Sequence, residues 1–284
     1  MMLTLPAPAK LNLSLRVIGE RPDGYHDIQT VYQFVDLGEC ISFESSPGGG
    51  LRIEGLPEGA HRPDAPSTVH RSCAAFAERT GCGALHLRIR VDKRTPMGGG
   101  LGGGSSDAAT VLHGLNLLCR AGLDTRALGE LGAGIGADVP LFIHGRSAIG
   151  SGRGDELEPC TPDEGVWCIV HPGISCSTAA MFTHSDLTPS GRIRKIPALL
   201  RDRQNDFQSL ARQLHPQIES AWNWLKRFAE PRLSGTGSCI FAGFASLDAA
   251  RQVAASVPDG WTSWAVRGIN RSPLLTELER VNGV

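Results

Sequence analysis

The chain has 284 residues, enough for one large domain or two ordinary ones, and 41% of its residues are hydrophobic. Its formal net charge is −1 at pH 7, which argues against the strongly basic surface that attracts nucleic acids and anionic membranes. We therefore expect a globular protein with neither a nucleic-acid nor a membrane partner.

The sequence shows no clear signal peptide, membrane span or metal-binding motif. No apolar run approaches the ~18 residues that cross a bilayer, and the opening MMLTLPAPAKLNL lacks the basic start and continuous apolar stretch of a signal peptide. None of the eight cysteines belongs to a C-x-x-C motif, and several lie in apolar runs. We expect reduced core thiols, no metal site in the protein and a cytoplasmic location.

The first predicted elements, in chain order, are strand 9–17, strands 30–37 and 40–44, loop 46–66, helix 67–80 and strand 85–91. The opening strand has a clear alternation, with Ala9, Leu11 and Leu13 on one face and polar residues on the other. The loop assignment rests on the many Gly and Pro residues of that stretch.

The most informative segment is PMGGGLGGGSSDAA, residues 96–109. Six of the seven residues from Gly98 to Gly104 are glycine, and a predicted helix with apolar periodicity follows. Glycine has no Cβ, so a ligand can lie directly on the backbone. A glycine-rich turn before a helix points free N–H groups and the positive end of the helix dipole at one place, which suits a phosphate. A flexible linker is the alternative, but the segment connects a predicted strand to a helix.

Known phosphate loops fit this segment poorly. A Walker A loop requires a lysine that is missing here, because Gly104 is followed by Ser105. The dinucleotide fingerprint G-x-G-x-x-G is met, but Asp124 opens a helical stretch where that fold needs a second strand ending in an acidic residue. The HRD and DFG motifs of protein kinases do not occur in the sequence.

Several charged side chains have two interpretations. Asp107 lies near the start of the predicted helix, where a partner of the helix dipole is the favoured interpretation. Asp138, in the small-residue turn GADVP, is either an N-cap or turn acceptor or a functional base. Lys10 lies in mid-strand, and a lone strand lysine usually faces solvent. Asn12 shares its face, because side chains two residues apart in a strand point the same way.

The later predicted elements are helix 125–131, strand 166–170, a polar and basic run 189–203, helix 216–228, a glycine turn within 232–242 that enters a strand, and a closing strand 264–266. The basic run is interpreted as a solvated loop or helix face, with contact to a ligand phosphate as the alternative. Strands and helices do not alternate strictly, so we predict an α+β protein with a boundary between residues 150 and 165.

Six segments carry a resemblance to known proteins: PAKLNLSLRV (8–17), RPDGYHDIQTVYQFVDLG (21–38), PMGGGLGGGSSDAA (96–109), GADVPLFIHG (136–145), HPGISCSTAAMF (171–182) and LSGTGSCIFA (233–242). Together they resemble the GHMP kinase superfamily of galacto-, homoserine, mevalonate and phosphomevalonate kinases. The resemblance implies a two-domain α+β fold with the site between the domains. Residues 1–155 would form an ATP-binding domain like the second domain of ribosomal protein S5, and residues 156–284 a ferredoxin-like domain.

DGYH together with AKLNL resembles one branch of this superfamily. This implies ATP-dependent phosphorylation, with Mg²⁺, of the 2-hydroxyl of 4-diphosphocytidyl-2-C-methyl-D-erythritol in the non-mevalonate isoprenoid pathway. Two alternatives remain: another small-molecule GHMP kinase, against which DGYH and Phe182 argue, and a non-catalytic binding protein on the same fold. Lys10 and Asp138 argue against the latter, because a binding protein needs no base.

The resemblance also implies residue roles. Asp138 would take the hydroxyl proton, and Lys10 would pair with that aspartate. Tyr25 and Phe182 would hold the cytosine from two sides. The turn 234–238 would support the phosphate loop. The other implied contacts are Asn12, His26 and Thr178 for the substrate, and for ATP the residues Pro96, Met97, Gly98, Gly99, Gly100, Leu101, Gly102, Gly103, Gly104, Ser105 and Ser106.

Overall fold

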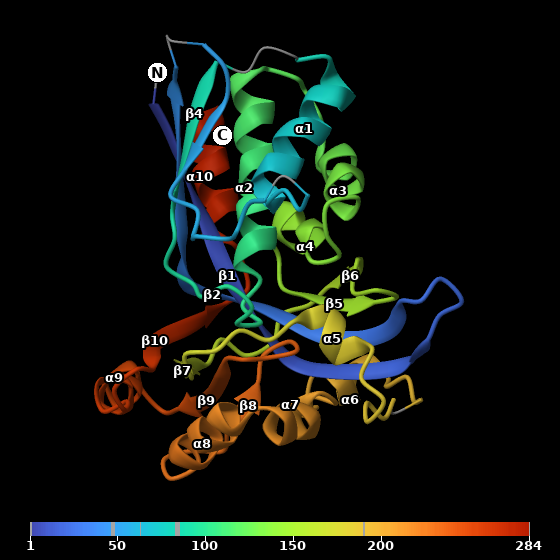
Figure 1. Ribbon diagram of the computed structural model, residues 1–284, viewed down its shortest axis with the longest axis vertical. Coiled ribbons are helices and arrows are strands. Elements are labelled where there is room, and N and C mark those ends of the chain that lie inside the picture. The colour runs from blue at the N-terminus through green and yellow to red at the C-terminus, as the bar shows by residue number, and fades with distance from the viewer. Residues whose placement is uncertain (1, 47–48, 63, 83–85, 190, 284) are drawn as a thin grey trace.

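Two long antiparallel strands, β1 (Met2–Glu20) and β2 (His26–Ser45), run through both lobes of the molecule (Figure 1). The computed structural model describes residues 2–46, 49–62, 64–82, 86–189 and 191–283. The first residue of the predicted strand 85–91 and parts of the predicted loop 46–66 and basic run 189–203 therefore lie outside the described residues.

The remaining strands are β3 (Arg52–Glu54), β4 (Leu87–Asp92), β5 (Ala148–Ser151), β6 (Glu156–Pro159), β7 (Val166–His171), β8 (Arg232–Leu233), β9 (Ile240–Phe244) and β10 (Thr262–Ile269). The helices are α1 (Thr68–Thr80), α2 (Gly103–Leu118), α3 (Thr125–Ala133), α4 (Val139–His144), α5 (Thr178–Phe182), α6 (Ile196–Leu199), α7 (Gln208–Leu214), α8 (Pro216–Leu225), α9 (Leu247–Ala255) and α10 (Pro273–Asn282). The prediction of an α+β fold is confirmed.

The upper lobe in Figure 1 is a sheet of β1, β2 and β4 with helices on one side. At the start of β1 burial alternates, with Leu5 and Ala7 completely buried. The alternation predicted for residues 9–17 does not hold, because every residue from Ala7 to Asn12 is buried and both faces of the strand are covered there. Residues 30–37 and 40–44, predicted as separate strands, form one strand. The glycine at the expected break, Gly38, pairs with Pro8, and a Cβ there would collide with the backbone of β1.

The lower lobe is built on β7, β8, β9 and β10, with α8 and α9 beside them (Figure 1). Strand β10 joins the lobes, because it pairs with β7 over most of its length and with β2 through Gly268 and Ile269. The prediction that strand 264–266 closes the element order is wrong. Helix α10 follows and returns to the upper lobe, where Leu274 and Leu278 enter its core. The division at residue 155 stays a prediction.

Several short elements escaped sequence analysis. Helix α4 begins after Asp138 and ends at Gly145, whose φ of +63° closes it. An apolar run of this length shows no periodicity that separates helix from strand. Helices α9 and α10 begin with serine caps, Ser246 and Ser272, each accepting a hydrogen bond from a backbone N–H of the first turn.

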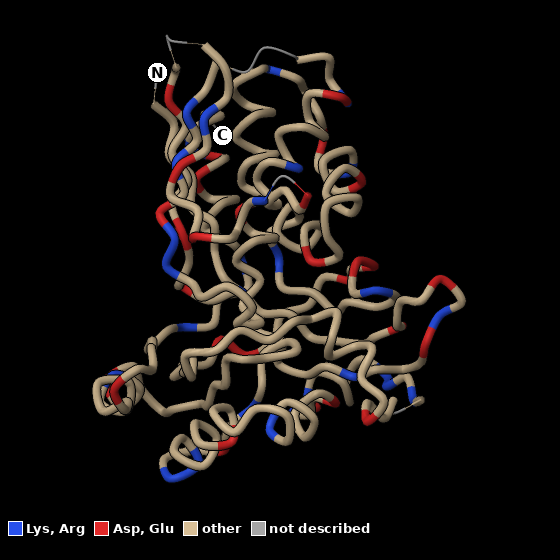
Figure 2. Tube along the Cα trace, viewed as in Figure 1, with Lys and Arg blue, Asp and Glu red and all other residues tan. Residues whose placement is uncertain are grey.

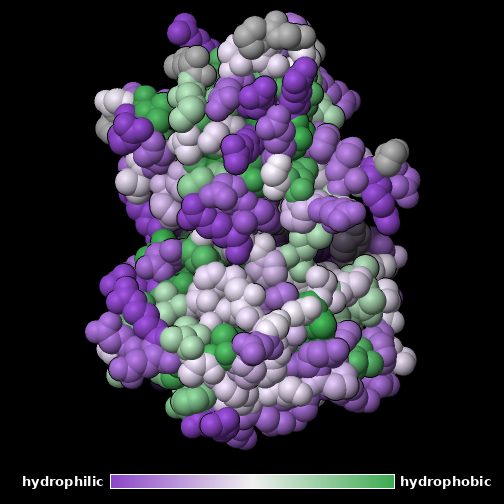
Figure 3. Space-filling model, turned by 60° about the vertical axis from the view of Figure 1, so that its left-hand side comes forward, coloured by the Kyte–Doolittle hydropathy of each residue, from purple (hydrophilic) through white to green (hydrophobic). Residues whose placement is uncertain are grey.

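Charge and hydropathy are mixed over the surface. Figure 2 shows Lys and Arg interspersed with Asp and Glu in both lobes, and Figure 3 shows hydrophobic residues scattered among hydrophilic ones on the face that it presents. Among the described residues, no helix combines the length and the apolar character needed to span a membrane. All eight cysteines are free thiols, and four of them are buried: Cys73, Cys168, Cys176 and Cys239.

Helix α2 lies so close to β2 that a side chain at one position would collide. A Cβ on Gly114 would stand 2.7 and 2.8 Å from ring carbons of the buried Phe43. We expect Gly114→Ala to lower the free energy of unfolding by about 1–3 kcal/mol, the usual cost of overpacking. Gly129 in α3 is a matched control, because its added Cβ would meet only the ring of His144 at 3.7 Å.

Gly129→Ala should therefore be neutral or stabilise by up to about 1 kcal/mol, the difference in helix propensity between the two residues. Urea unfolding of both variants measures the free energies. Equal stability of the two variants would contradict the close approach of α2 to β2.

Candidate active site

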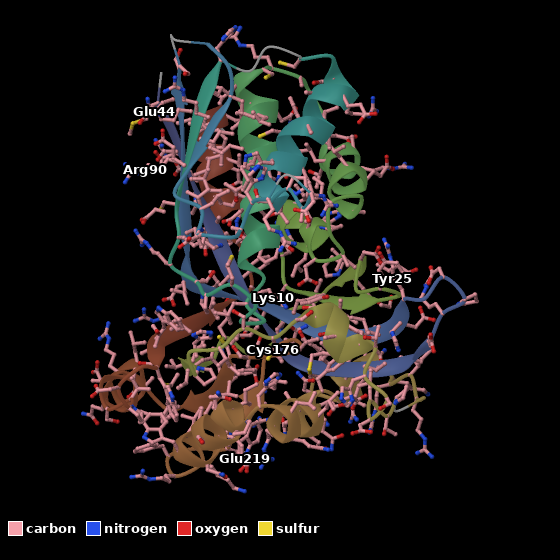
Figure 4. All side chains as sticks on the ribbon, viewed as in Figure 1. Lys10, Tyr25, Glu44, Arg90, Cys176 and Glu219 are labelled. Carbon is pink, nitrogen blue, oxygen red and sulfur yellow. The ribbon has the colours of Figure 1, made fainter. Side chains whose placement is uncertain are left out.

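A cavity of about 610 Å³ lies where the two lobes meet. Its wall brings together most of the residues that sequence analysis singled out. Figure 4 places Lys10 at this junction, with Cys176 just below it and Tyr25 further out on the side of the β1–β2 hairpin. The predicted residues that line the cavity are Lys10, Asn12, Asp138, Thr178, Phe182 and the loop from Pro96 to Ser105.

The glycine loop has a backbone conformation that residues with a side chain rarely adopt. Gly98, Gly100 and Gly102 have φ values of +64°, +73° and +74°, in the left-handed region that other residues rarely adopt. Gly102 is the N-cap of α2, and its carbonyl accepts hydrogen bonds from Ser105 N–H at 3.0 Å and Ser106 N–H at 2.9 Å. The N–H groups of Gly103 and Gly104, which come before these two, have no acceptor within the helix and remain for a ligand.

A turn from the far end of the chain holds the loop. The hydroxyl of Ser234 donates to the carbonyl oxygen of Gly100 at 2.8 Å. The backbone N–H groups of Ser238 and Cys239 donate to the carbonyl oxygens of Gly98 and Gly99, both at 3.1 Å. The turn 234–238 therefore supports the glycine loop as predicted, and the binding of phosphate by that loop stays a prediction.

The two serines after the glycines differ in position. Ser105 lines the cavity, whereas Ser106 is buried and its hydroxyl has no hydrogen-bond partner among the described residues. Gly104 is exposed, and a Cβ there would meet nothing closer than the Thr68 hydroxyl at 3.5 Å. The space beside Gly104 is therefore free of other protein atoms, and a side chain at this position would extend into the cavity.

Lys10 is buried rather than facing solvent as a lone strand lysine usually does. Its side chain is 4% exposed, and Nζ lies 3.3 Å from Asp138 Oδ2 and 2.5 Å from Asn12 Oδ1. The Lys10 N–H donates to the Leu101 carbonyl at 2.9 Å, which fastens β1 to the glycine loop. The side chain of Asp138 is 30% exposed and makes no cap hydrogen bond to α4, so its carboxylate faces the cavity.

Tyr32 is a site residue that sequence analysis missed. Its hydroxyl donates to Asp138 Oδ1 at 3.1 Å, and its ring lies 5.5 Å from Lys10 Nζ. Burial, with the charge of Asp138, raises the pKa of Tyr32 well above its usual value, so the phenol stays protonated as a donor. The feature that indicates a role for Tyr32 is its position on β2, directly opposite Asn12 on β1.

Asp107 has a different role from the predicted one. It lies beyond the first turn of α2, is buried, and accepts a hydrogen bond from Lys93 Nζ at 2.8 Å, while the same ammonium lies 3.0 Å from Glu39 Oε1. Burial raises the pKa of Asp107 to about 6 against the opposing effect of Lys93. It is therefore an ion-pair partner of Lys93 at the cavity wall, not a partner of the helix dipole.

Asn12 and Thr178, which are predicted to contact the substrate, both make hydrogen bonds within the protein. Asn12 Nδ2 donates to the Thr30 hydroxyl at 2.8 Å, and its N–H lies 3.4 Å from the Ser234 hydroxyl. Thr178, at the start of α5, is 3.2 Å from the Thr236 hydroxyl of the supporting turn. Both side chains therefore keep a fixed orientation at the cavity wall.

The predicted aromatic residues do not all reach the cavity. The Phe182 ring lines it and packs against the rings of His26 at 5.3 Å and Phe207 at 4.7 Å. Tyr25 is 54% exposed at the end of the β1–β2 hairpin, after a turn in which Gly24 has a φ of +79°. Neither Tyr25 nor His26 is among the described residues that line the cavity.

Arg153 connects Tyr25 to the cavity and was not singled out from the sequence. Its guanidinium lies 5.0 Å from the centre of the Tyr25 ring, donates to Asp155 Oδ2 at 2.6 Å, and belongs to a residue that lines the cavity. In the sequence, the only feature that marks Arg153 is the pair of glycines on either side of it, Gly152 and Gly154, which indicates a turn.

Comparisons with known proteins agree with this architecture. The family models "GHMP kinases N terminal domain" and "GHMP kinases C terminal" match residues 67–146 and 185–262. A 4-diphosphocytidyl-2-C-methyl-D-erythritol kinase of Marinobacter nauticus is 41% identical over 98% of this chain and 99% of that protein. One of Mannheimia succiniciproducens is 38% identical over 98% of this chain and 91% of that protein.

A crystal structure of a 4-(cytidine 5'-diphospho)-2C-methyl-D-erythritol kinase superposes with a TM-score of 0.79 and 31% identity. The match covers 94% of this chain and 99% of that structure. The predicted GHMP kinase fold is confirmed, and the chain belongs to the GHMP kinases, in the family of the 4-diphosphocytidyl-2-C-methyl-D-erythritol kinases.

Proposed function

We propose that this protein transfers the γ-phosphoryl group of ATP to the 2-hydroxyl of 4-diphosphocytidyl-2-C-methyl-D-erythritol. The observation that carries the proposal is the Lys10–Asp138 ion pair beside the glycine loop in one cavity. Residues 1–155 supply the loop and the ion pair, and residues 156–284 supply Thr178, Phe182 and the supporting turn. A binding protein without catalysis would have no use for a carboxylate held in this way.

The glycine loop would hold the β- and γ-phosphates of ATP. Free N–H groups at the start of α2, the helix dipole and the open space at Gly104 fit a phosphate group. The Ser105 hydroxyl at the same wall would add a donor or hold Mg²⁺ that enters with the nucleotide. The ion supplies positive charge against the phosphate oxygens, and Mg²⁺ usually keeps several of its waters in such sites.

Asp138 would accept the proton of the substrate hydroxyl as that oxygen attacks phosphorus. Lys10 forms an ion pair with the carboxylate and the Tyr32 hydroxyl donates to it, so both residues fix its orientation. The Lys10 ammonium also brings positive charge close to the loop, because a Cβ on Gly102 would stand 3.0 Å from Lys10 Cε. Positioning and charge stabilisation supply most of the catalysis in phosphoryl transfer, and this pair provides both.

The cytidine end of the substrate would lie toward Phe182 and the β1–β2 hairpin. Phe182 offers a ring face at the cavity wall, His26 packs against that ring, and Tyr25 stands beyond it. We propose that the cytosine lies between Phe182 and Tyr25 with His26 at its edge. The Arg153 guanidinium, between Tyr25 and the cavity, would contact the diphosphate of the substrate.

Gly104→Ala tests the phosphate cradle without disturbing the fold. The added methyl group would meet no protein atom closer than 3.5 Å but would stand where we place the phosphates. Calorimetry should show ATP affinity lowered by at least about tenfold, which is ~1.4 kcal/mol. Gly129→Ala, the helical control remote from the loop, should bind ATP normally. Unchanged ATP affinity in Gly104→Ala would place the nucleotide elsewhere.

Asp138→Asn keeps the shape of the side chain and removes its basicity. We expect kcat to fall by roughly a hundredfold to ten-thousandfold, with substrate affinity within a few-fold of wild type. Lys10→Met should also lower kcat, and the double variant should lose less than the product of both effects, because the residues act as one unit. Single-turnover kinetics at saturating ATP measure all three variants. Wild-type turnover in Asp138→Asn would show that Asp138 is not the base.

Tyr25→Ala tests the cytosine position, since this exposed ring contributes little packing. Affinity for the cytidine substrate should fall by about 1–3 kcal/mol, the usual value of stacking on a base, and ATP affinity should not change. Phe228→Ala removes another exposed ring, on the lower lobe, and should alter neither affinity. If Tyr25→Ala weakens ATP as much as the cytidine substrate, the ring has a structural role instead.

A further inference from the structure

The lower lobe contains a second cavity, of about 840 Å³, which the proposed reaction does not use. Residues from β7, β8, the end of β9 and the stretch 203–209 form its wall. Among the described residues, none lines both this cavity and the catalytic one. Its volume lies in the range of small-molecule sites.

Arg232 of β8 presents a cation to this cavity. Its guanidinium carbon lies 4.8 Å from the centre of the Trp167 ring and 4.9 Å from that of Phe241, so two aromatic rings support it. Its one hydrogen bond to a described residue is a long one, 3.4 Å to the carbonyl oxygen of Leu13. A guanidinium has five N–H donors, and within the described part of the chain no ion pair engages this one.

A second arginine, Arg203, lines the same cavity. Burial, together with the like charge of Arg203, lowers the pKa of Arg232 to about 10. The cavity wall also carries Asp163, Asp206 and Glu230. Asp206 is already engaged, because it accepts hydrogen bonds from Arg16 at 3.1 Å and from the Val17 N–H at 2.9 Å.

We propose that this cavity binds the phosphate or diphosphate group of a small molecule between Arg203 and Arg232. An anion there would relieve the repulsion of the two like charges. The planar guanidinium of Arg232, held against two rings, matches the oxygens of a phosphate. Thr188, Gln204 and Ser209 add polar side chains to the same wall.

The site is linked to the glycine loop through the side chain of Asn205 and the turn that follows Arg232. Asn205 lines the cavity, and its Nδ2 donates to the carbonyl oxygens of Leu233 at 2.9 Å and Gly235 at 2.8 Å. Leu233 follows Arg232, and the turn beginning at Ser234 holds the loop. A bound anion would thus stabilise the arrangement of the turn and the loop, an effect beyond the proposed reaction itself.

Titration calorimetry with inorganic diphosphate tests this site. The full chain is first saturated with a non-hydrolysable ATP analogue, so that the glycine loop is filled. We expect saturable binding of one diphosphate, weakened by at least about tenfold in Arg203→Gln and in Arg232→Met through loss of charged donors. Arg227→Gln is the matched control, because that guanidinium lies over Phe228 outside the cavity, and it should bind as wild type does.

Arg203 is exposed, so Arg203→Gln should fold and keep its activity without diphosphate, even if Arg232→Met does not fold. Absence of saturable binding, or unchanged affinity in Arg203→Gln, would overturn the proposal. So would loss of binding in Arg153→Gln alone, since that would place the diphosphate in the catalytic cavity. Equal binding of malonate would contradict a site for phosphate.

Discussion

The glycine loop has almost no side chains of its own to hold it, so its shape depends on hydrogen bonds to the turn that begins at Ser234. That turn donates to the carbonyl oxygens of Gly98, Gly99 and Gly100. A Cβ on Gly100 would collide with the Ser234 carbonyl, so the contact also requires glycine. The shape of the glycine loop therefore depends on a turn that lies 134 residues further along the sequence, and the cavity lies where the two segments meet.

Strand β1 brings Lys10 and Asn12 to this loop. Its pairing with β2 shifts register between Pro8 and Lys10 and again between Asn12 and Ser14. Such bulges re-aim side chains, and here they flank the stretch that carries the lysine and the asparagine. The Lys10 side chain consequently contacts the glycine loop, Tyr32 and Asp138, and it is shielded from solvent. The cost of burying its charge is offset by the carboxylate and by the Asn12 oxygen.

Local patterns in the sequence predicted the parts of the fold that depend on local chemistry. Alternation identified β1, and the helix predicted over residues 67–80 differs from α1 only at its first residue. The ion pair of Asp107 with Lys93 could not be predicted, because it depends on how β4 and α2 pack. The same holds for Tyr32, whose role follows from cross-strand register, and for Arg203 and Arg232, which tertiary structure brings to one cavity. Motif resemblance supplied Lys10 and Asp138 as a pair, and the structure places them 3.3 Å apart.

A crystal structure with a non-hydrolysable ATP analogue and 4-diphosphocytidyl-2-C-methyl-D-erythritol tests the central claim most directly. The γ-phosphate should rest on the backbone around Gly104, and the 2-hydroxyl oxygen should lie within hydrogen-bond distance of the Asp138 carboxylate and in line with phosphorus. A complex in which both ligands are ordered but the hydroxyl points away from Asp138, or the phosphates lie off the glycine loop, would contradict the proposed reaction.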